Sequence, residues 1–117
     1  MDTPTAFDRT ALDRLLRIGG AGLVAQMIAL FREAAAARLQ EARVAAAGGD
    51  LRGVGRAAHA LVSSAGNVGA AELMAAARAL EAAAADSAEA TDALARVEDA
   101  YARLAAPLAA YERELPA

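Results

Sequence analysis

Residues 48–70 read GGDLRGVGRAAHALVSSAGNVGA, a stretch that contains one whole helix and the signals that begin and end it. Asp50 follows two glycines and is a good N-cap, while Gly66 and Asn67 tolerate the left-handed backbone that closes a helix. At about 100° per residue, one face of this helix is apolar. That face consists of Leu51, Val54, Ala58, Leu61 and Ala65. The sequence therefore predicts a helix over about residues 50–65 that packs one face into a core.

His59 is the single histidine of the chain, and helix geometry points it away from the apolar face and toward solvent. Its neighbours on the exposed face, at i−4, i+4 and i+7, are Gly55, Ser63 and Gly66. Glycine inside a helix costs about 1 kcal/mol relative to alanine, so these small residues indicate that clearance around the ring is useful. Packing of Gly55 against a neighbouring helix is the structural alternative.

The composition of the whole chain is typical of an all-α protein. Hydrophobic residues make up 57% of its 117 residues and aromatic residues only 3%, and the abundant alanine favours helices that approach one another closely. This length suits one domain with a single core, so we expect residues 1–117 to form one domain. Short turns between the expected helices predict an up-and-down antiparallel four-helix bundle with a short extra N-terminal helix.

Glycines and capping residues divide the chain into the expected helices. They run from Thr5 or Asp8 to Gly19-Gly20, over about residues 22–47, 51–65 and 70–85, and onward from Ser87 or Thr91. The helix over about residues 22–47 has an expected inward stripe of Leu23, Met27, Leu30 and Ala34, which Phe31 widens. Pro107 falls inside the last helix and is expected to kink or end it near Ala106.

The composition also disfavours several classes of function. The chain has no cysteine, which rules out disulfides and thiol chemistry, and a single histidine without cysteine disfavours a zinc site. A formal net charge of −3 argues against generic nucleic-acid binding. The acidic residues are scattered as on a solvated surface and do not suggest a hydrolase pair. Eight of the fifteen show this pattern on the expected outward faces: Glu33, Glu41, Glu72, Glu81, Asp86, Glu89, Glu98 and Asp99.

Neither the N-terminal segment nor the most apolar stretch of the sequence suggests export or insertion into a membrane. Met1–Thr10 carries charges and lacks the apolar segment of a secretory signal. Ile18–Phe31 is the most apolar stretch, but it is shorter than the roughly 20 residues that span a bilayer. We therefore expect a cytoplasmic protein with no membrane segment, and the start at Met1 leads us to expect a free-standing one.

The residues around His59 suit phosphoryl chemistry. A neutral imidazole is a good nucleophile near neutral pH and can attack a phosphoryl group and later release it. Arg56 at i−3 and Arg52 at i−7 share the exposed face, so either guanidinium is placed to pair with the resulting anion. Ser63 at i+4 can donate a hydrogen bond to it.

The run from His59 to Ala70 resembles the signature of histidine-containing phosphotransfer (HPt) domains. In that signature the histidine is followed by leucine at i+2, lysine at i+3, glycine at i+4, serine at i+5 and Gly-Ala at i+10 and i+11. A leucine and then Leu-Glu follow on the next helix. The matching residues here are Leu61, Ser64, Gly69-Ala70, Leu73 and Leu80-Glu81, with Phe31 and Gly49-Asp50 upstream. The resemblance covers about residues 11–105.

This resemblance implies a helical bundle that shuttles phosphoryl groups between receiver-domain aspartates in a multistep phosphorelay. His59 would be the phosphorylated residue, and Ser64, Asn67 and Gly69 would shape the end of its helix. The implied partners are a response-regulator receiver domain, a hybrid histidine kinase or both. The chain would be a phosphoryl carrier without a cofactor or metal of its own, because the receiver domain would supply Mg²⁺ and the catalytic groups.

Two positions depart from the family pattern. Val62 stands where the family usually has lysine, and Ser63 stands where it usually has glycine. Because all twelve basic residues are arginines, an arginine would have to replace the lysine, and Arg56 is the first candidate. The partner would dock on the face formed by Gly55, Val62, Ser63 and Gly66.

Two other functions remain open at this point. In the first, the same face binds a receiver domain or a kinase without transferring phosphate, as an inhibitor or adaptor does. In the second, the bundle is purely structural and oligomerises through its alanine-rich surfaces. We expect a monomer if the chain is a phosphotransfer protein.

Overall fold

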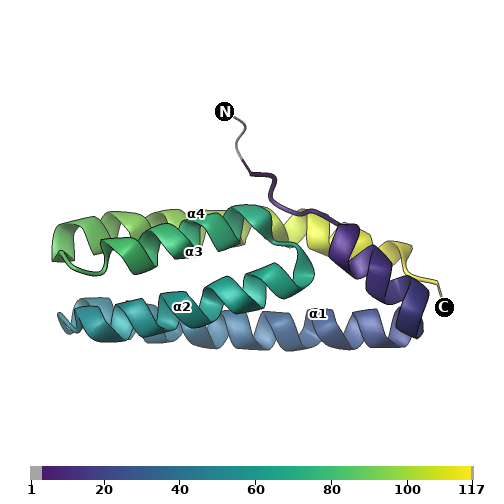
Figure 1. The fold of residues 1–117 in the computed structure, drawn as a ribbon, viewed down its shortest axis with the longest axis horizontal. Coiled ribbons are helices and arrows are strands. Elements are labelled where there is room, and N and C mark those ends of the chain that lie inside the picture. The colour runs from purple at the N-terminus through teal and green to yellow at the C-terminus, as the bar shows by residue number, and fades with distance from the viewer. Residues whose placement is uncertain (1–3, 117) are drawn as a thin grey trace.

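The computed structural model describes residues 4–116, and these residues form four helices and no strand. The helices are α1 (Thr10–Ala47), α2 (Leu51–Val68), α3 (Ala71–Ala83) and α4 (Ser87–Glu114). Consecutive helices run antiparallel, with α1 beside α2 and α3 beside α4 (Figure 1). The predicted all-α, up-and-down bundle is confirmed. Met1, on which the expectation of a free-standing protein rests, lies outside the described residues.

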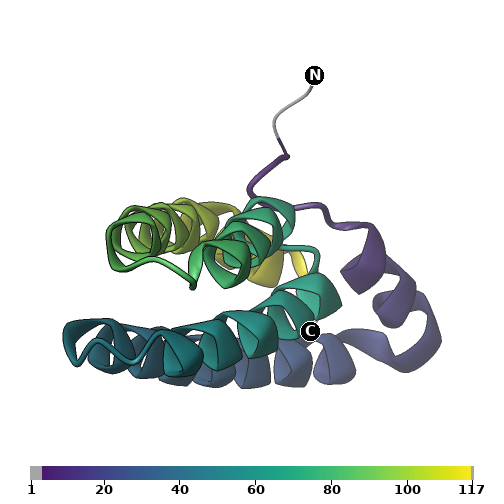
Figure 2. The same cartoon turned by 60° about the vertical axis from the view of Figure 1, so that its left-hand side comes forward.

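The short extra N-terminal helix is the first part of α1. Gly20 has a non-helical backbone, with φ 82° and ψ 176°, a conformation that glycine reaches without the steric cost that a side chain brings. The chain bends there, so the residues before it fold back over one end of the bundle (Figure 2). This helix begins at Thr10 and not at Thr5 or Asp8. The Asp8 carboxylate instead accepts hydrogen bonds from the amide and hydroxyl of Thr10, at 3.0 and 2.7 Å.

The inward face of α1 differs from the predicted one by one residue, except at Phe31, which is buried as predicted. Leu23 and Leu30 are 37% and 54% exposed, and Met27 and Ala34 are half-buried. The buried residues are Val24, Ile28, Phe31, Ala35, Leu39 and Ala42. Both stripes have helical spacing, but the buried one continues through Ala35, Leu39 and Ala42 for two more turns, whereas the predicted one stops at Ala34. The longer stripe buries more apolar area, which explains why it faces the core.

Helix α2 begins where predicted but ends later. Asp50 is its N-cap and accepts from the amide of Gly53 at 2.9 Å. Gly66 and Asn67 lie inside the helix, which ends at Val68 with Gly69 as its left-handed C-cap, φ 80°. The predicted end was wrong because Val68 is fully buried and its burial favours one more helical turn.

Gly69 is also where the N-terminal segment meets the turn between α2 and α3. The amide of Asp8 donates to the carbonyl of Gly69 at 2.8 Å, and the amide of Glu72 donates to the carbonyl of Thr5 at 2.9 Å. A Cβ atom on Gly69 would collide with the carbonyl oxygen of Asp8. Both the positive φ and this close approach therefore require glycine here.

Helix α4 corrects two predictions. Its N-cap is Asp86, which accepts from the amide of Glu89 at 3.0 Å, and not Ser87 or Thr91. The helix continues through Pro107 to Glu114, so it does not end near Ala106. A proline inside a helix loses one backbone hydrogen bond, but Tyr111 and Leu108 beyond it are buried, and their packing keeps the last turns in place.

Among the described residues, α1 is long and apolar enough to cross a membrane by length and composition alone. The helix is broken at Gly20, and its residues Val24, Ile28 and Phe31 lie in the core of the bundle. The core helix of a globular domain passes the same test, so this is weak evidence for a membrane span.

Candidate functional site

The middle of α2 presents His59 to solvent. Its side chain is 74% exposed, while the opposite face of the helix is buried in the bundle. The buried residues are Val54, Ala57, Ala58, Leu61, Ala65 and Val68. The predicted orientation of His59 is confirmed, because the capped helix fixes which residues face the core.

Glu81 on α3 holds one nitrogen of the imidazole ring. His59 Nδ1 lies 2.8 Å from Oε2 of Glu81. An ionised carboxylate can only accept a hydrogen bond, so Nδ1 carries the hydrogen and the neutral ring keeps its lone pair on Nε2. Nε2 lies across the ring from Nδ1, so it points away from Glu81. The contact therefore leaves one nucleophilic nitrogen in reach of a reactant.

The sequence analysis missed this role of Glu81 and placed it with the solvated carboxylates. Its side chain is 42% exposed, so it does lie at the surface, but beside the imidazole. The signal that existed in the sequence was the Leu80-Glu81 pair of the family-like pattern. Leu80 is fully buried, and its neighbour Glu81 therefore lies at the edge of α3 that faces α2.

Arg52 and Arg56 lie on the exposed face of α2, and neither forms an ion pair within residues 4–116. Arg56 lines an open groove of about 660 Å³ between α1 and α2, together with Arg38 and Ala60. His59 therefore has Arg56 on the side toward α1 and the Glu81 carboxylate on the side toward α3. Arg38, which the sequence analysis did not single out, is bound to Glu41 at 2.8 Å.

The small residues near His59 lie mostly along the edge between α2 and α3. A Cβ atom on Gly55 would lie 3.7 Å from Cβ of Ala84, an ordinary contact, and one on Gly66 would lie 3.2 Å from Sδ of Met74. Val62 is half-buried and packs against the core, so only its outer part is open to a partner. Ser63 is exposed. The structural alternative for Gly55, packing against α3, agrees with this geometry.

Ser64 and Asn67 do not cap the helix. The Ser64 hydroxyl donates to the carbonyl of Ala60 at 3.3 Å, one turn back. Both residues line a shallow apolar pocket of about 210 Å³ whose other wall includes Met27 and Leu30 of α1. Gly69 alone of the three shapes the helix end, because the helix continues past the other two.

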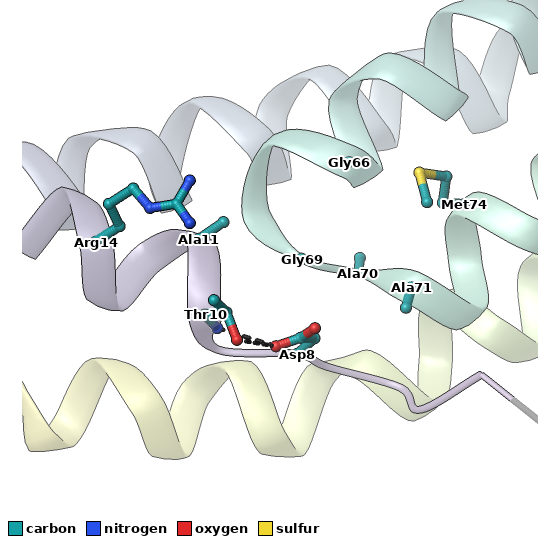
Figure 3. Close-up of a pocket in the computed structure, with 9 residues that line it drawn as sticks. All are labelled: Asp8, Thr10, Ala11, Arg14, Gly66, Gly69, Ala70, Ala71 and Met74. Atoms are coloured by element: carbon teal, nitrogen blue, oxygen red, sulfur yellow. Dashed lines mark hydrogen bonds between the residues drawn. The ribbon is translucent and has the colours of Figure 1, made fainter.

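A second cavity lies away from His59, between the N-terminal helix, the end of α2 and the start of α3. It has a volume of about 260 Å³, and its charged lining residues are Asp8 and Arg14. Figure 3 shows the Asp8 carboxylate turned toward Thr10, to which it is hydrogen-bonded. Across the part of the chain that the structure describes, no three acidic or histidine side chains gather closely enough to hold a metal ion.

A family model described as the Hpt domain matches residues 26–107 of this chain. The match begins in the second part of α1, contains all of α2 and α3, and ends at Pro107 in α4. Comparison with curated proteins and with solved structures gives no match.

Proposed function

The chain belongs to the Hpt domain family, and we propose that it carries a phosphoryl group on His59 between receiver-domain aspartates of a multistep phosphorelay. The family connects the chain to histidine phosphotransfer in general. The observation that supports His59 as the acceptor is its geometry, since its side chain is exposed and Glu81 holds Nδ1 at 2.8 Å. An exposed, oriented nucleophile on a rigid helix suits a protein that passes a group from one partner to another.

The reaction needs little from this chain beyond His59 and Glu81. The Nε2 lone pair attacks the phosphorus of an aspartyl phosphate, the Nε2–P bond forms, the P–O bond to the aspartate breaks, and a carboxylate leaves. Positive charge develops on the imidazole, because Nδ1 keeps its hydrogen. The Glu81 carboxylate faces that hydrogen and stabilises the developing charge. The reverse sequence returns the phosphoryl group to a second aspartate.

The partner completes the site. Transfer of a phosphoryl dianion requires positive charge around its oxygens. In our proposal, Mg²⁺ bound to the receiver domain supplies most of that charge, and Arg56 and Arg52 supplement it from α2. The receiver docks over Ser63 and Gly66, and Gly55 and Val62 form the α3 side of this face.

We further propose that residues 1–117 act as one cytoplasmic, monomeric Hpt domain whose partners are a receiver domain, a hybrid histidine kinase or both. The helix before Gly20 and the last turns of α4 lie outside the matched family range. They pack on each other through Tyr111 and Asp13, so we regard them as part of the same domain.

The test is transfer of radiolabelled phosphate from phosphorylated receiver domains of the same organism to the purified protein. Wild-type protein should gain label, and His59→Ala should gain none while it keeps its helical content and thermal midpoint. Binding of a receiver without label on the wild type would instead support the inhibitor or adaptor function. Absence of both label and binding with every receiver would leave only a structural role.

A further inference from the structure

Arg78 on α3 lies at a level, along the helix pair, between two contacts that join α3 to the histidine helix. These two contacts fix the register of the antiparallel pair. His59 meets Glu81 at 2.8 Å, and a Cβ atom on Gly66 would lie 3.2 Å from Sδ of Met74. Arg78 lies between Met74 and Glu81 along the helix axis, and around the axis it is about 40° from Met74 and about 60° from Glu81, on their solvent side. It is the basic residue of α3, and its exposed side chain starts about one helical turn from the level of His59.

The twelve arginines divide into five that pair with carboxylates and seven that form no ion pair within residues 4–116. Five of them bind carboxylates within 4.0 Å, through the pairs Arg9–Asp13, Arg32–Glu112, Arg38–Glu41, Arg43–Glu98 and Arg103–Glu72. The second group includes Arg52, Arg56 and Arg78, which are exposed residues of the two helices that meet at His59. Positive charge near the imidazole is thus left without a protein anion.

The surface between Arg78 and His59 suits a long cationic side chain. The register that pairs residue 59 with 81 and 66 with 74 brings Val62 opposite Arg78. Val62 is half-buried and apolar, so the aliphatic stem of Arg78 can lie along it while the guanidinium stays in water. A phosphoryl group on Nε2 stands across the ring from the Glu81 carboxylate, which leaves its oxygens open to this guanidinium.

We propose that Arg78 binds the phosphoryl oxygens of phosphorylated His59. This inference rests on the proposed function and extends it from α2 to α3. The two residues of α3 then have separate tasks, because Glu81 orients the unmodified imidazole and Arg78 pairs with the anion that forms on it. Arg78 is thus a phosphate-binding residue supplied by the helix next to the histidine helix.

The experiment uses phosphoramidate, a small donor that needs no protein partner. Its P–N bond breaks as the Nε2–P bond forms, and ammonia leaves. The pH titration of the ³¹P resonance then reports the pKa of the phosphoryl group on His59. A neighbouring guanidinium favours the dianion, so Arg78→Ala should raise this pKa by about 0.2–0.7 unit, as expected for one exposed ion pair. Arg78→Lys should restore part of the difference.

Arg96→Ala is the matched control, because Arg96 is an exposed arginine on α4 that lines a different groove with Glu89 and Asp92. In this variant the phosphoryl group on His59 should have the same pKa as in the wild type. An unchanged pKa in Arg78→Ala, with phosphorylated His59 present, overturns the role of Arg78 and leaves the proposed function intact. A pKa shift that appears in Arg56→Ala and not in Arg78→Ala would also overturn the role of Arg78. No phosphohistidine on the wild type, from this donor or from receiver domains, would reject the proposed function itself.

Discussion

The surface around His59 and the junction around Tyr111 use charged residues in opposite ways. At the junction, the Tyr111 hydroxyl donates to Asp13 at 2.9 Å, Arg9 lies 5.0 Å from the Tyr111 ring, and Arg9 also pairs with Asp13 at 3.1 Å. Around His59, one carboxylate faces the ring and the nearby arginines have no protein partner. Charges that are satisfied within the chain hold the fold together, whereas unsatisfied charges remain available to a ligand.

The difference also appears in the backbone. At the junction, residues 4–9 bind the turn between α2 and α3 through two backbone hydrogen bonds, and the Phe7 ring meets Tyr111 edge-on at 5.4 Å. At the site, α2 is a regular helix whose exposed face has small side chains. The junction therefore tolerates few substitutions, and the site tolerates many that change chemistry without changing stability.

Gly69→Ala is the most disruptive change that we expect at the junction. It places a Cβ atom on a residue with φ 80° and into the carbonyl oxygen of Asp8. The strain and the displaced N-terminal segment should lower the free energy of unfolding by more than about 2 kcal/mol. Urea denaturation measures the loss. A variant as stable as the wild type would show that the N-terminal segment does not depend on this approach.

Glu81→Gln should produce the largest change at the site that leaves the fold intact. The amide can either donate to Nδ1 or accept from it, so it no longer selects the tautomer or stabilises positive charge on the imidazole, and phosphotransfer should slow about tenfold. Thermal unfolding should stay within about 0.5 kcal/mol of the wild type, because the residue is at the surface. An unchanged transfer rate in a labelled-phosphate assay would show that the Nδ1 contact has no part in the reaction.

Tyr111→Phe removes the hydroxyl that donates a hydrogen bond to Asp13, and it should lower the thermal midpoint by about 3 °C. Burial and the bond to Asp13 raise the pKa of Tyr111 to about 12. The stabilisation that the protonated phenol provides is therefore full below the ordinary pKa of about 10 and is lost as the pH rises toward 12. Wild-type protein should lose stability over this alkaline range, and Tyr111→Phe should lose less.

The same contact between Tyr111 and Asp13 predicts how the stability changes at low pH. The hydrogen bond from Tyr111, and then the one from Arg9, lower the pKa of Asp13. Its stabilising contribution is present above the ordinary carboxyl pKa and disappears as the pH falls through the lowered value. Midpoints of thermal unfolding measured across pH should show a smaller acid loss in Tyr111→Phe. Identical pH profiles for the two proteins would contradict the coupling of Asp13 to Tyr111.

Gly55→Ala should have the smallest effect and separates the two interpretations of this glycine. The added methyl group lies at an ordinary distance from Ala84, and the gain in helix propensity should stabilise the protein by about 0.5–1 kcal/mol. Transfer from a receiver domain should change less than about twofold, since the methyl group lies against α3. A larger decrease would show that the glycine provides clearance for the docked partner.

Features determined by neighbours along the chain were predictable from the sequence. The N-cap at Asp50, the burial of Leu61 and the exposure of His59 depend only on the period of one helix and its first residue. The all-α bundle follows from short turns between such helices. The predicted inward stripe of α1 failed because Leu23 and Val24 begin two overlapping stripes, and packing against the other helices decides between them.

Features that depend on contacts between distant segments were not predictable. Gly69 ends α2 because Val68 is buried and because Asp8 binds there, and neither fact is visible in the local pattern. The contact of Glu81 with His59 depends on the register of α2 and α3, which sequence alone leaves open. The same register places Arg78 at the level of Val62, from a position that no motif of the sequence indicated.

The position of the phosphoryl group on the imidazole ring tests the central claim most directly. Wild-type protein phosphorylated by phosphoramidate and by a receiver domain should show one phosphohistidine, at His59, with a ¹⁵N–³¹P coupling to Nε2 and the hydrogen retained on Nδ1. Phosphorylation at Nδ1, or at a residue other than His59, would contradict the account, because the Glu81 contact would then not define the reactive nitrogen.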